Sequence, residues 1–258
     1  MIIGENTIVN ENAVNSLAKN YNILDYPVKL SSLLKDVYPS SDFDNFSKYD
    51  LHKALNDTII QNYDGEEILK YKLFEQHINK RNLIAAFEVK VNASRVDFLA
   101  INGSTTSFEI KSKLDNLSKL SKQMADYMLA FEYNYVVIDE RHVEKAKLLL
   151  PASYGLLIYK EGRCEKLRKA KLNDKLDPKV QLGILTKREL TDAFPKIEGG
   201  LNHILNFYDI QYINRKFKKV LKERYRSRWE FLISNRNSIF PIDIQFFFNT
   251  NIQPSHIY

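Results

Sequence analysis

The segment from Ser94 to Tyr127 constrains the fold of this chain more than any other. Residues 95–102 form a nearly continuous apolar run, which is typical of a strand buried on both faces. The pair Asn102-Gly103 follows, and this pair favours a tight β-turn. We therefore predict a β-hairpin that is centred on Gly103, with a return strand over residues 107–111.

Three charged residues interrupt this hairpin where a core strand would hold apolar side chains. A loop centred on Gly103 places Asp97 opposite Glu109, with Cβ atoms about 5 Å apart, and alternation puts Lys111 on the face of Glu109. Two carboxylates at that distance repel each other unless a cation lies between them. Carboxylate oxygens are ligands of Mg²⁺, and a lysine beside them supplies a positive charge for metal-assisted phosphodiester hydrolysis.

The triplet Glu-x-Lys alone is not specific, because the chain contains it twice. The other copy, Glu88-Val89-Lys90, has no acid that we predict on a facing strand, although Glu88 could approach the site from the first strand. The alternative interpretation is a half-exposed hairpin on which Asp97, Glu109 and Lys111 form an ordinary ion-pair cluster. A helix predicted over residues 114–132 favours the site, because Gln123 and Tyr127 lie four residues apart on one helix face.

The run Asp97-x11-Glu-Ile-Lys-x11-Gln-x3-Tyr resembles the PD-(D/E)xK nuclease superfamily, and its Gln-Tyr pair resembles the RecB-like branch. Residues 94–127, followed by YVVIDERHVEKA, more closely resemble a branch of small stand-alone bacterial nucleases. The resemblance covers residues 66–160. The chain has Val96 where the superfamily name has proline.

This resemblance implies a restriction-endonuclease-like fold and a set of site residues. Asp97, Glu109 and the carbonyl group of Ile110 would bind Mg²⁺, for which Mn²⁺ would substitute. Lys111 would position or activate the attacking water. A third acid would come from the first core helix, where Glu67 is the best match and Glu66 its rival. Gln123 and Tyr127 would contact the scissile nucleotide or steady the region around Lys111.

Periodicity along the chain predicts an α/β protein with a hairpin in its sheet and helical extensions at both ends, and the resemblance implies a mixed central sheet with flanking helices. We divide it into a mostly helical extension (1–65), a nuclease core (66–172) and a basic, mainly helical region (173–258). Within these segments we predict helices over 50–63, 66–79, 142–150 and 201–235, and strands over 84–91, YVVID and YGLLIY.

Basic residues gather in the second part of the chain. Residues 1–65 hold nine acids and five lysines, so residues 66–258 carry a net charge of +10 against +6 for the whole chain. Such a charge is consistent with a polyanionic partner, here DNA. The run 215–228 predicts a helix that presents Lys218, Lys219, Lys222 and Arg226 to phosphates, with a solvated basic face as the alternative.

The remaining features narrow the setting. One cysteine, no apolar run of membrane-spanning length and no signal-peptide pattern predict a cytoplasmic protein without a membrane partner. The apolar segment 239–248 predicts packing against the core, a second subunit or another protein partner. We predict a Mg²⁺-dependent DNA nuclease, with defence against foreign DNA or service to a mobile element as its setting. The alternatives are an inactive nucleic-acid-binding module and an RNA-directed nuclease.

Overall fold

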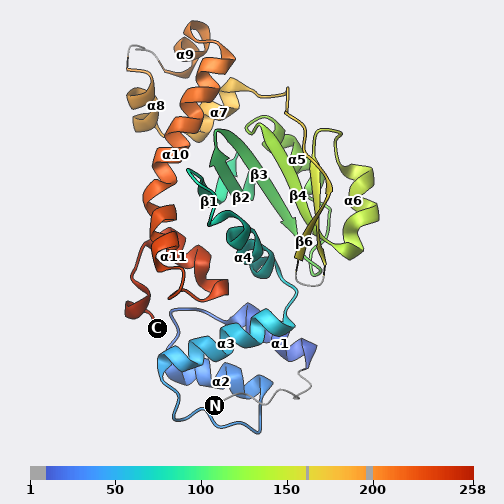
Figure 1. The fold of residues 1–258 in the computed structure, drawn as a ribbon, viewed down its shortest axis with the longest axis vertical. Coiled ribbons are helices and arrows are strands. Elements are labelled where there is room, and N and C mark those ends of the chain that lie inside the picture. Colours follow the sequence, from blue (N-terminus) through green and yellow to red (C-terminus); the bar gives the residue numbers. More distant parts are fainter. Residues whose placement is uncertain (1–9, 161–162, 196–199) are drawn as a thin grey trace. The chain divides into compact units, whose positions relative to one another are not determined.

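A computed structural model of the chain describes residues 10–160, 163–195 and 200–258. These residues form two compact units (Figure 1). One unit comprises the described residues up to Tyr71 together with Leu232–Tyr258, and the other comprises Lys72–Phe231. The units therefore differ from the three consecutive segments predicted from the sequence, because the end of the chain joins the N-terminal helices. No helix in the described part of the chain has the length and apolar content that a bilayer crossing needs.

The larger unit is built on a mixed six-stranded sheet, which confirms the predicted α/β class. Its strands lie in sequence order from β1 to β6. β1, β2 and β3 are antiparallel neighbours, β3, β4 and β5 are parallel, and β6 returns antiparallel to β5. The strands are β1 (Ile84–Val91), β2 (Ser94–Asn102), β3 (Ser104–Lys111), β4 (Tyr133–Asp139), β5 (Gly155–Lys160) and β6 (Arg163–Arg168).

The β2–β3 hairpin has the predicted register. Phe98 pairs with Phe108 and Asn102 pairs with Ser104, so the turn is centred on Gly103. Gly103 has φ 78°, in the left-handed region that glycine adopts without a steric penalty. The hairpin prediction is therefore confirmed.

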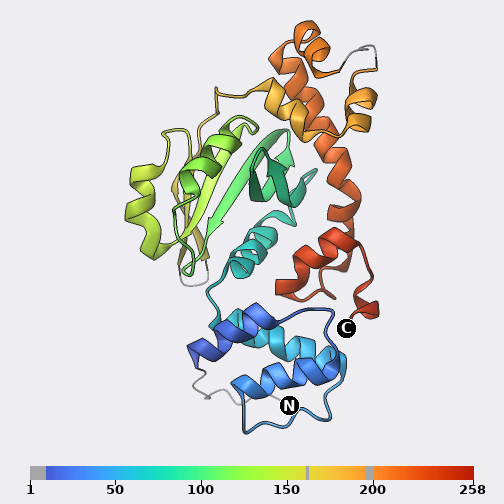
Figure 2. The ribbon, with the colours of Figure 1, turned by 180° about the vertical axis from the view of Figure 1, so that it is seen from behind.

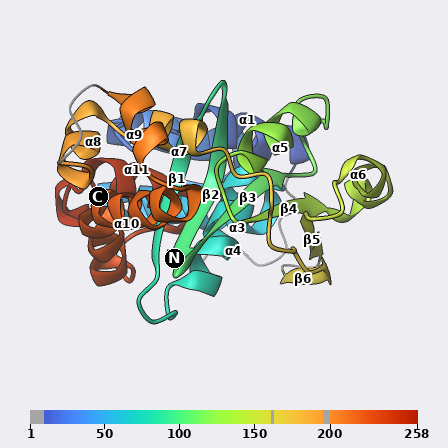
Figure 3. The same ribbon diagram turned by 90° about the horizontal axis from the view of Figure 1, so that it is seen from above.

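Helices cover both faces of this sheet (Figures 2 and 3). α5 (Leu120–Met128) and α6 (Val143–Leu149) pack on one face, where Met124 and Ala146 join Val136 and Ile138 in a buried cluster. The second half of α4 (Glu66–His77) lies on the other face, since the His77 ring contacts the rings of Phe98 and Phe108. Trp229 of α10 (Ile210–Asn235) contacts Phe98 on that same face.

The helix predicted over residues 114–132 is shorter than expected. Its first part is instead a turn, in which the backbone N–H and the hydroxyl of Ser112 donate to the Asp115 carboxylate and Asn116 accepts from the Ser118 backbone. Side chains of this kind compete with the helical backbone for hydrogen bonds. α5 consequently begins only at Leu120.

The long helix predicted over residues 201–235 is two helices. α9 (Leu201–Phe207) ends before Asp209, whose side chain accepts a hydrogen bond from the Tyr212 backbone N–H at 2.7 Å and starts α10. The preceding helices are α7 (Pro178–Ile184) and α8 (Lys187–Ala193). Thr186 and Glu189 form a capping box at the start of α8.

The smaller unit is helical. Its elements are α1 (Glu11–Asn20), α2 (Pro27–Val37), α3 (Lys48–Asn62), the first turns of α4, the end of α10, and α11 (Ile244–Thr250), which lies between the short 3-10 helices η2 (Pro241–Asp243) and η3 (Pro254–His256). The apolar C-terminal segment packs here, with Ile244, Phe247 and Phe248 buried. Asp243 of η2 is also buried, where it accepts hydrogen bonds from Tyr21, Asn56 and Tyr258.

Candidate functional site

Strands β2 and β3 separate at the position of the two predicted acids. Their ladder runs as far as Phe98 and Phe108, so the next residues, Asp97 and Glu109, face each other where the pairing ends. From there β2 continues beside β1, and β3 continues beside β4 through Lys111. The Asp97 carboxylate accepts a hydrogen bond of 2.6 Å from the backbone N–H of Ile110. This carboxylate thus takes a backbone donor at the point where the strands part.

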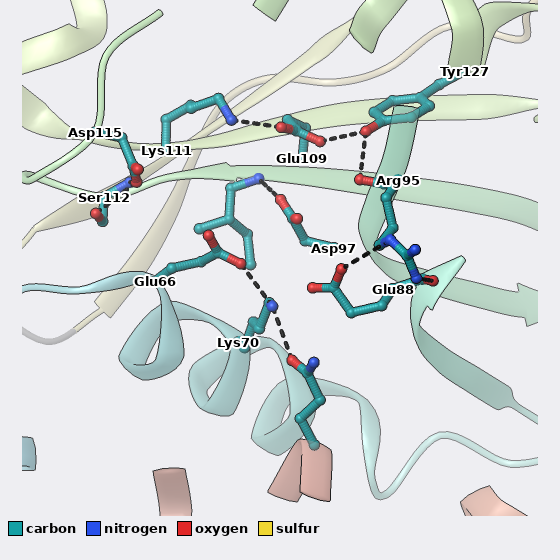
Figure 4. A network of polar contacts seen from close by, with 12 residues as sticks. Glu66, Lys70, Glu88, Arg95, Asp97, Glu109, Lys111, Ser112, Asp115 and Tyr127 are labelled. Carbon is teal, nitrogen blue, oxygen red and sulfur yellow. Dashed lines mark hydrogen bonds and ion pairs between the residues drawn. The ribbon is translucent and has the colours of Figure 1, made fainter. Parts of the chain in front are cut away.

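The Glu109 side chain is fully buried and is the centre of a polar network (Figure 4). Its Oε1 atom accepts from the Lys111 ammonium group at 2.6 Å. Its Oε2 atom lies 2.7 Å from the Tyr127 hydroxyl, which also lies 2.8 Å from the backbone carbonyl of Arg95. A buried carboxylate needs partners of this kind, because desolvation without them is very unfavourable.

The charges of this network act on its titratable groups. Burial alone would lower the pKa of Lys111, but neighbouring carboxylates, Glu109 above all, raise it above its usual value. Burial and the charge of Glu109 raise the pKa of the Tyr127 phenol. Lys111 is therefore a cation and Tyr127 a neutral hydrogen-bond donor at neutral pH.

Glu88 brings a further carboxylate to Asp97. The register of β1 with β2 pairs Phe87 with Phe98 and Val89 with Val96, so Glu88 lies across from Asp97. A carboxylate oxygen of Glu88 lies within 4.8 Å of one of Asp97. Glu88 has φ 56°, a left-handed conformation that is unusual for a non-glycine residue and that clusters at functional sites. The sequence singled out Glu88 only as a secondary candidate.

The predicted helix residues lie on α5, as expected. Tyr127 is buried and reaches Glu109, whereas Gln123 is half-buried. The Gln123 Oε1 atom is buried and has no hydrogen-bond partner among the described residues. A buried amide oxygen without a partner is unfavourable, so this oxygen is available to a bound donor.

The third acid predicted from the resemblance lies at the start of α4. Glu66 and Glu67 both occupy the first turn of this helix, and Glu66 forms an ion pair of 2.6 Å with Lys70 one turn later. α4 continues without a break to His77, whose ring packs on the sheet. Adjacent helical positions point about 100° apart, so only one of the two acids can face a given ligand. The choice between Glu67 and Glu66 stays a prediction.

Acids and hard oxygen atoms suit a divalent cation of the Mg²⁺ type. In the larger unit, Glu88 and Asp97 have carboxylate oxygens within 4.8 Å of each other, and the fully buried Glu109 lies opposite Asp97, so these three residues could offer such ligands. The carbonyl group of Ile110 belongs to the same strand segment. Its role as a ligand stays a prediction.

The four basic residues predicted on α10 fall into two pairs. The Lys218 ammonium group binds Glu132 at 2.8 Å and the Gly103 carbonyl at 2.9 Å, and Lys222 donates to the Asn82 carbonyl at 2.6 Å. Lys219 and Arg226 are exposed, and Arg226 contacts Glu223 and Glu230 on its own helix. Lys219 and Arg226 are thus the pair whose side chains extend into solvent.

One protein family matches the sequence over most of its length. The family described as Bacteriophage P4 protein cII matches residues 61–247. The chain belongs to this family. Protein cII of Enterobacteria phage P4 is 26% identical over 132 residues, which are 50% of this chain and 46% of that protein. The chain thus spans about half the length of the curated cII protein that it matches.

A solved structure of a protein of unknown function from Silicibacter pomeroyi is also similar. It is 21% identical, covers 54% of this chain and 97% of its own, and superposes with a TM-score of 0.36. A score this low supports no conclusion about the fold. The cII-family match spans residues 61–247, a range in which all the predicted site residues from Glu67 to Arg226 lie.

Sequence reasoning missed one residue that shapes the site of this cII-family chain. Asp126 on α5 accepts hydrogen bonds from the Ser94 hydroxyl at 2.5 Å and from the Asn92 amide at 3.1 Å. It therefore ties α5 to the β1–β2 turn next to Tyr127. Its contact with Asn92 and Ser94 joins segments that lie far apart in the sequence, and such a contact leaves no periodic pattern. The sequence therefore offers one signal for Asp126, its place beside Tyr127.

Proposed function

We propose that this chain is a Mg²⁺-dependent nuclease that hydrolyses phosphodiester bonds of DNA, with a restriction-endonuclease-like core of the PD-(D/E)xK type. One observation carries the proposal. Glu109, which is fully buried, is bound by Lys111 and lies across from Asp97 where strands β2 and β3 separate. The spacing Asp97-x11-Glu109-Ile110-Lys111, which resembles that superfamily, supports it.

The site residues divide the chemistry between them. Asp97, Glu109 and the Ile110 carbonyl would hold the metal ion, with Glu88 as a further carboxylate. When bound, Mg²⁺ supplies Lewis-acid polarisation of the phosphate and lowers the pKa of a water ligand.

Lys111 acts as a fixed cation in this proposal. Its raised pKa favours the protonated form, which stabilises negative charge on the phosphate or orients the attacking water. The Tyr127 hydroxyl orients the Glu109 carboxylate, and the Gln123 oxygen, which no described residue contacts by a hydrogen bond, accepts a donor from the nucleotide or from a water.

Recognition of the DNA backbone falls to exposed cations. Lys219 and Arg226 on α10 are available to phosphates, whereas Lys218 and Lys222 already bind groups of the protein. Arg95 is also exposed and lies 3.8 Å from Glu88 beside the acids. These contacts are independent of base sequence.

A nucleic-acid-binding module without turnover is the second candidate. The exposed basic residues of α10 favour it, because they can bind phosphates without any catalytic residue. Retention of Asp97, Glu109 and Lys111 together favours the enzyme, since binding alone does not need the three in one cluster.

The test is cleavage of circular DNA, linear DNA and RNA by the purified chain with Mg²⁺, Mn²⁺ or EDTA. We expect divalent-ion-dependent cleavage of DNA, which Asp97→Ala, Glu109→Ala and Lys111→Ala each reduce at least a hundredfold with unchanged circular dichroism. Glu144→Ala and Lys147→Ala, which remove exposed charges of the same types on α6, serve as matched controls. Cleavage of RNA alone would assign an RNA-directed nuclease.

Two results would contradict the proposal. Binding of DNA without cleavage under any ion would assign the binding module. Wild-type activity of Glu109→Ala, together with loss of activity in Glu88→Ala, would move the catalytic triplet to the first strand.

A further inference from the structure

A pocket opens on the face of the sheet opposite to Asp97 and Glu109. It has a volume of about 430 Å³, within the usual range for small-molecule sites. Ala100, Thr106 and Phe108 contribute to its wall, and alternation along β2 and β3 places these side chains on the other face from the two acids. The pocket is thus separate from the proposed nuclease site.

Two lysines line this pocket, and its described lining includes no acid. They are Lys80, which follows α4, and Lys166 of β6. Neither forms an ion pair with any residue that the structure describes. Burial, followed by the charge of Lys166, lowers the pKa of Lys80. Two cations held near each other favour a ligand that carries about two negative charges.

An aromatic surface forms another part of the wall. The rings of Phe108 and Tyr135 stack at 5.4 Å with an angle of 13° between their planes. Gly155 lies opposite Tyr135 on β5, and a Cβ atom there would lie 2.1 Å from the Tyr135 ring. Because Gly155 has no side chain, the Tyr135 ring fits beside it. Aromatic rings in a pocket offer stacking to a planar ligand group.

A row of polar side chains completes the pocket. Asn102, Ser104 and Thr106 lie at the tip of the β2–β3 hairpin and line the pocket. None of their side chains is hydrogen-bonded to a described residue in this structure. Together they offer hydroxyl and amide groups to the hydroxyls of a sugar or the edge of a base.

We propose that this pocket binds a nucleoside phosphate, with the phosphate between Lys80 and Lys166 and the planar base beside Tyr135. A terminal phosphate monoester carries about two negative charges at pH 7, which matches the two lysines. The pocket is a ligand site distinct from the substrate site of the proposed nuclease, and it does not depend on that activity.

The test measures binding of AMP, GMP, CMP and UMP to the full chain in EDTA, with the fluorescence of its single tryptophan as the signal. Trp229 contacts Phe98 on the pocket face of the sheet, so ligand binding should change its emission. Calorimetry provides a second readout. We expect at least one nucleotide to bind at least ten times more tightly than adenosine or inorganic phosphate.

Variants connect this binding to the pocket. Lys80→Ala and Lys166→Ala should each weaken binding about tenfold, and Tyr135→Leu should weaken it about fivefold. Lys179→Ala, which removes an exposed lysine on α7, should leave it unchanged. Asp97→Asn should also bind normally, which separates this pocket from the proposed metal site. Equal melting temperatures without ligand verify that the lysine variants fold.

Three outcomes would overturn the inference. The first is that none of the four nucleotides binds at millimolar concentration. The second is that binding survives in both lysine variants. The third is that inorganic phosphate binds as tightly as the nucleotides, which would remove the role of the aromatic wall.

Discussion

The buried carboxylate of Asp243 predicts an unusual dependence of stability on pH. Burial raises the pKa of Asp243 to about 7, although hydrogen bonds from Tyr258, Asn56 and Tyr21 favour the charged form. In the unfolded chain the pKa is that of an ordinary aspartate, near 4. The folded state thus binds a proton more tightly, and its stability falls as the pH rises from about 4 to about 7.

The perturbation is Asp243→Asn, which removes the charge and keeps an oxygen that can accept the same donors. The difference between the two pKa values corresponds to about 4 kcal/mol as an upper limit. We expect the variant to equal wild type in stability near pH 4 and to exceed it by about 2–4 kcal/mol above pH 7. The lower value allows for an amide that fits the three donors less well than a carboxylate.

The wild-type pH profile alone would not reveal this effect. His52, whose Nδ1 atom lies 2.8 Å from the Tyr21 hydroxyl, belongs to the same network. Burial, and then the charge of Lys48, lower the pKa of His52 to about 4. The folded state therefore binds a proton less tightly at His52, so this residue adds stability as the pH rises from about 4 to 6.5, opposite to Asp243. The difference between variant and wild type cancels the His52 contribution.

The assay is urea unfolding of both proteins from pH 4 to pH 8, followed by circular dichroism. An unchanged slope of free energy against urea concentration verifies that the comparison is valid. Asn56→Ala is a suitable contrast, because it removes a donor to Asp243 and should destabilise the chain at pH 8. A variant that is less stable than wild type at pH 8, or a difference that does not vary with pH, would refute the reasoning.

Three further predictions concern the proposed site and its surroundings. Mg²⁺ should stabilise the wild-type protein by about 2.7 kcal/mol at 100 times its Kd and so raise its melting temperature, and Asp97→Asn should abolish this rise. A wild-type melting temperature that does not change with the ion would argue for a plain ion-pair cluster. Glu88→Gly should alter stability by less than about 1 kcal/mol, whereas Glu88→Val should destabilise by about 1–2 kcal/mol because φ is 56° there; equal melts would mean that the strand adapts. Neutralising Lys219 and Arg226 should lower the salt slope of DNA binding by about two units, and an unchanged slope would assign both residues to a solvated face. Lys218→Ala should mainly lower the melting temperature, because it removes the ion pair with Glu132.

The sequence allowed the hairpin and its register to be predicted, because local chemistry determines both. Asn102-Gly103 determines the position of the turn, and the apolar run before it determines which residues of β2 share a face. Together these two signals place Asp97 opposite Glu109. The parallel strands β4 and β5 were also readable as short apolar runs. Each of these signals lies within a few residues.

Other elements could not be read, for identifiable reasons. β6, with the sequence RCEKLR, is an edge strand whose side chains are mostly exposed, so it has no apolar alternation. The turn before α5 depends on how Ser112 and Asp115 pair, and both residues are also compatible with a helix. The contact of Asp243 with Tyr21 joins opposite ends of the chain, which no local pattern encodes.

The interruption of the β2–β3 ladder explains why acids occupy this part of the core at all. In a continued ladder Ile110 would face Val96, and its N–H would bond to a strand backbone. Instead its donor binds the Asp97 carboxylate at 2.6 Å, so the acid satisfies the backbone group that strand separation would leave unpaired. The separation in turn allows β3 to follow β4 while β2 follows β1. Asp97 is therefore a structural element of the fork as well as a proposed ligand, and Asp97→Asn, which retains an acceptor oxygen, tests the ligand role with less disturbance than Asp97→Ala.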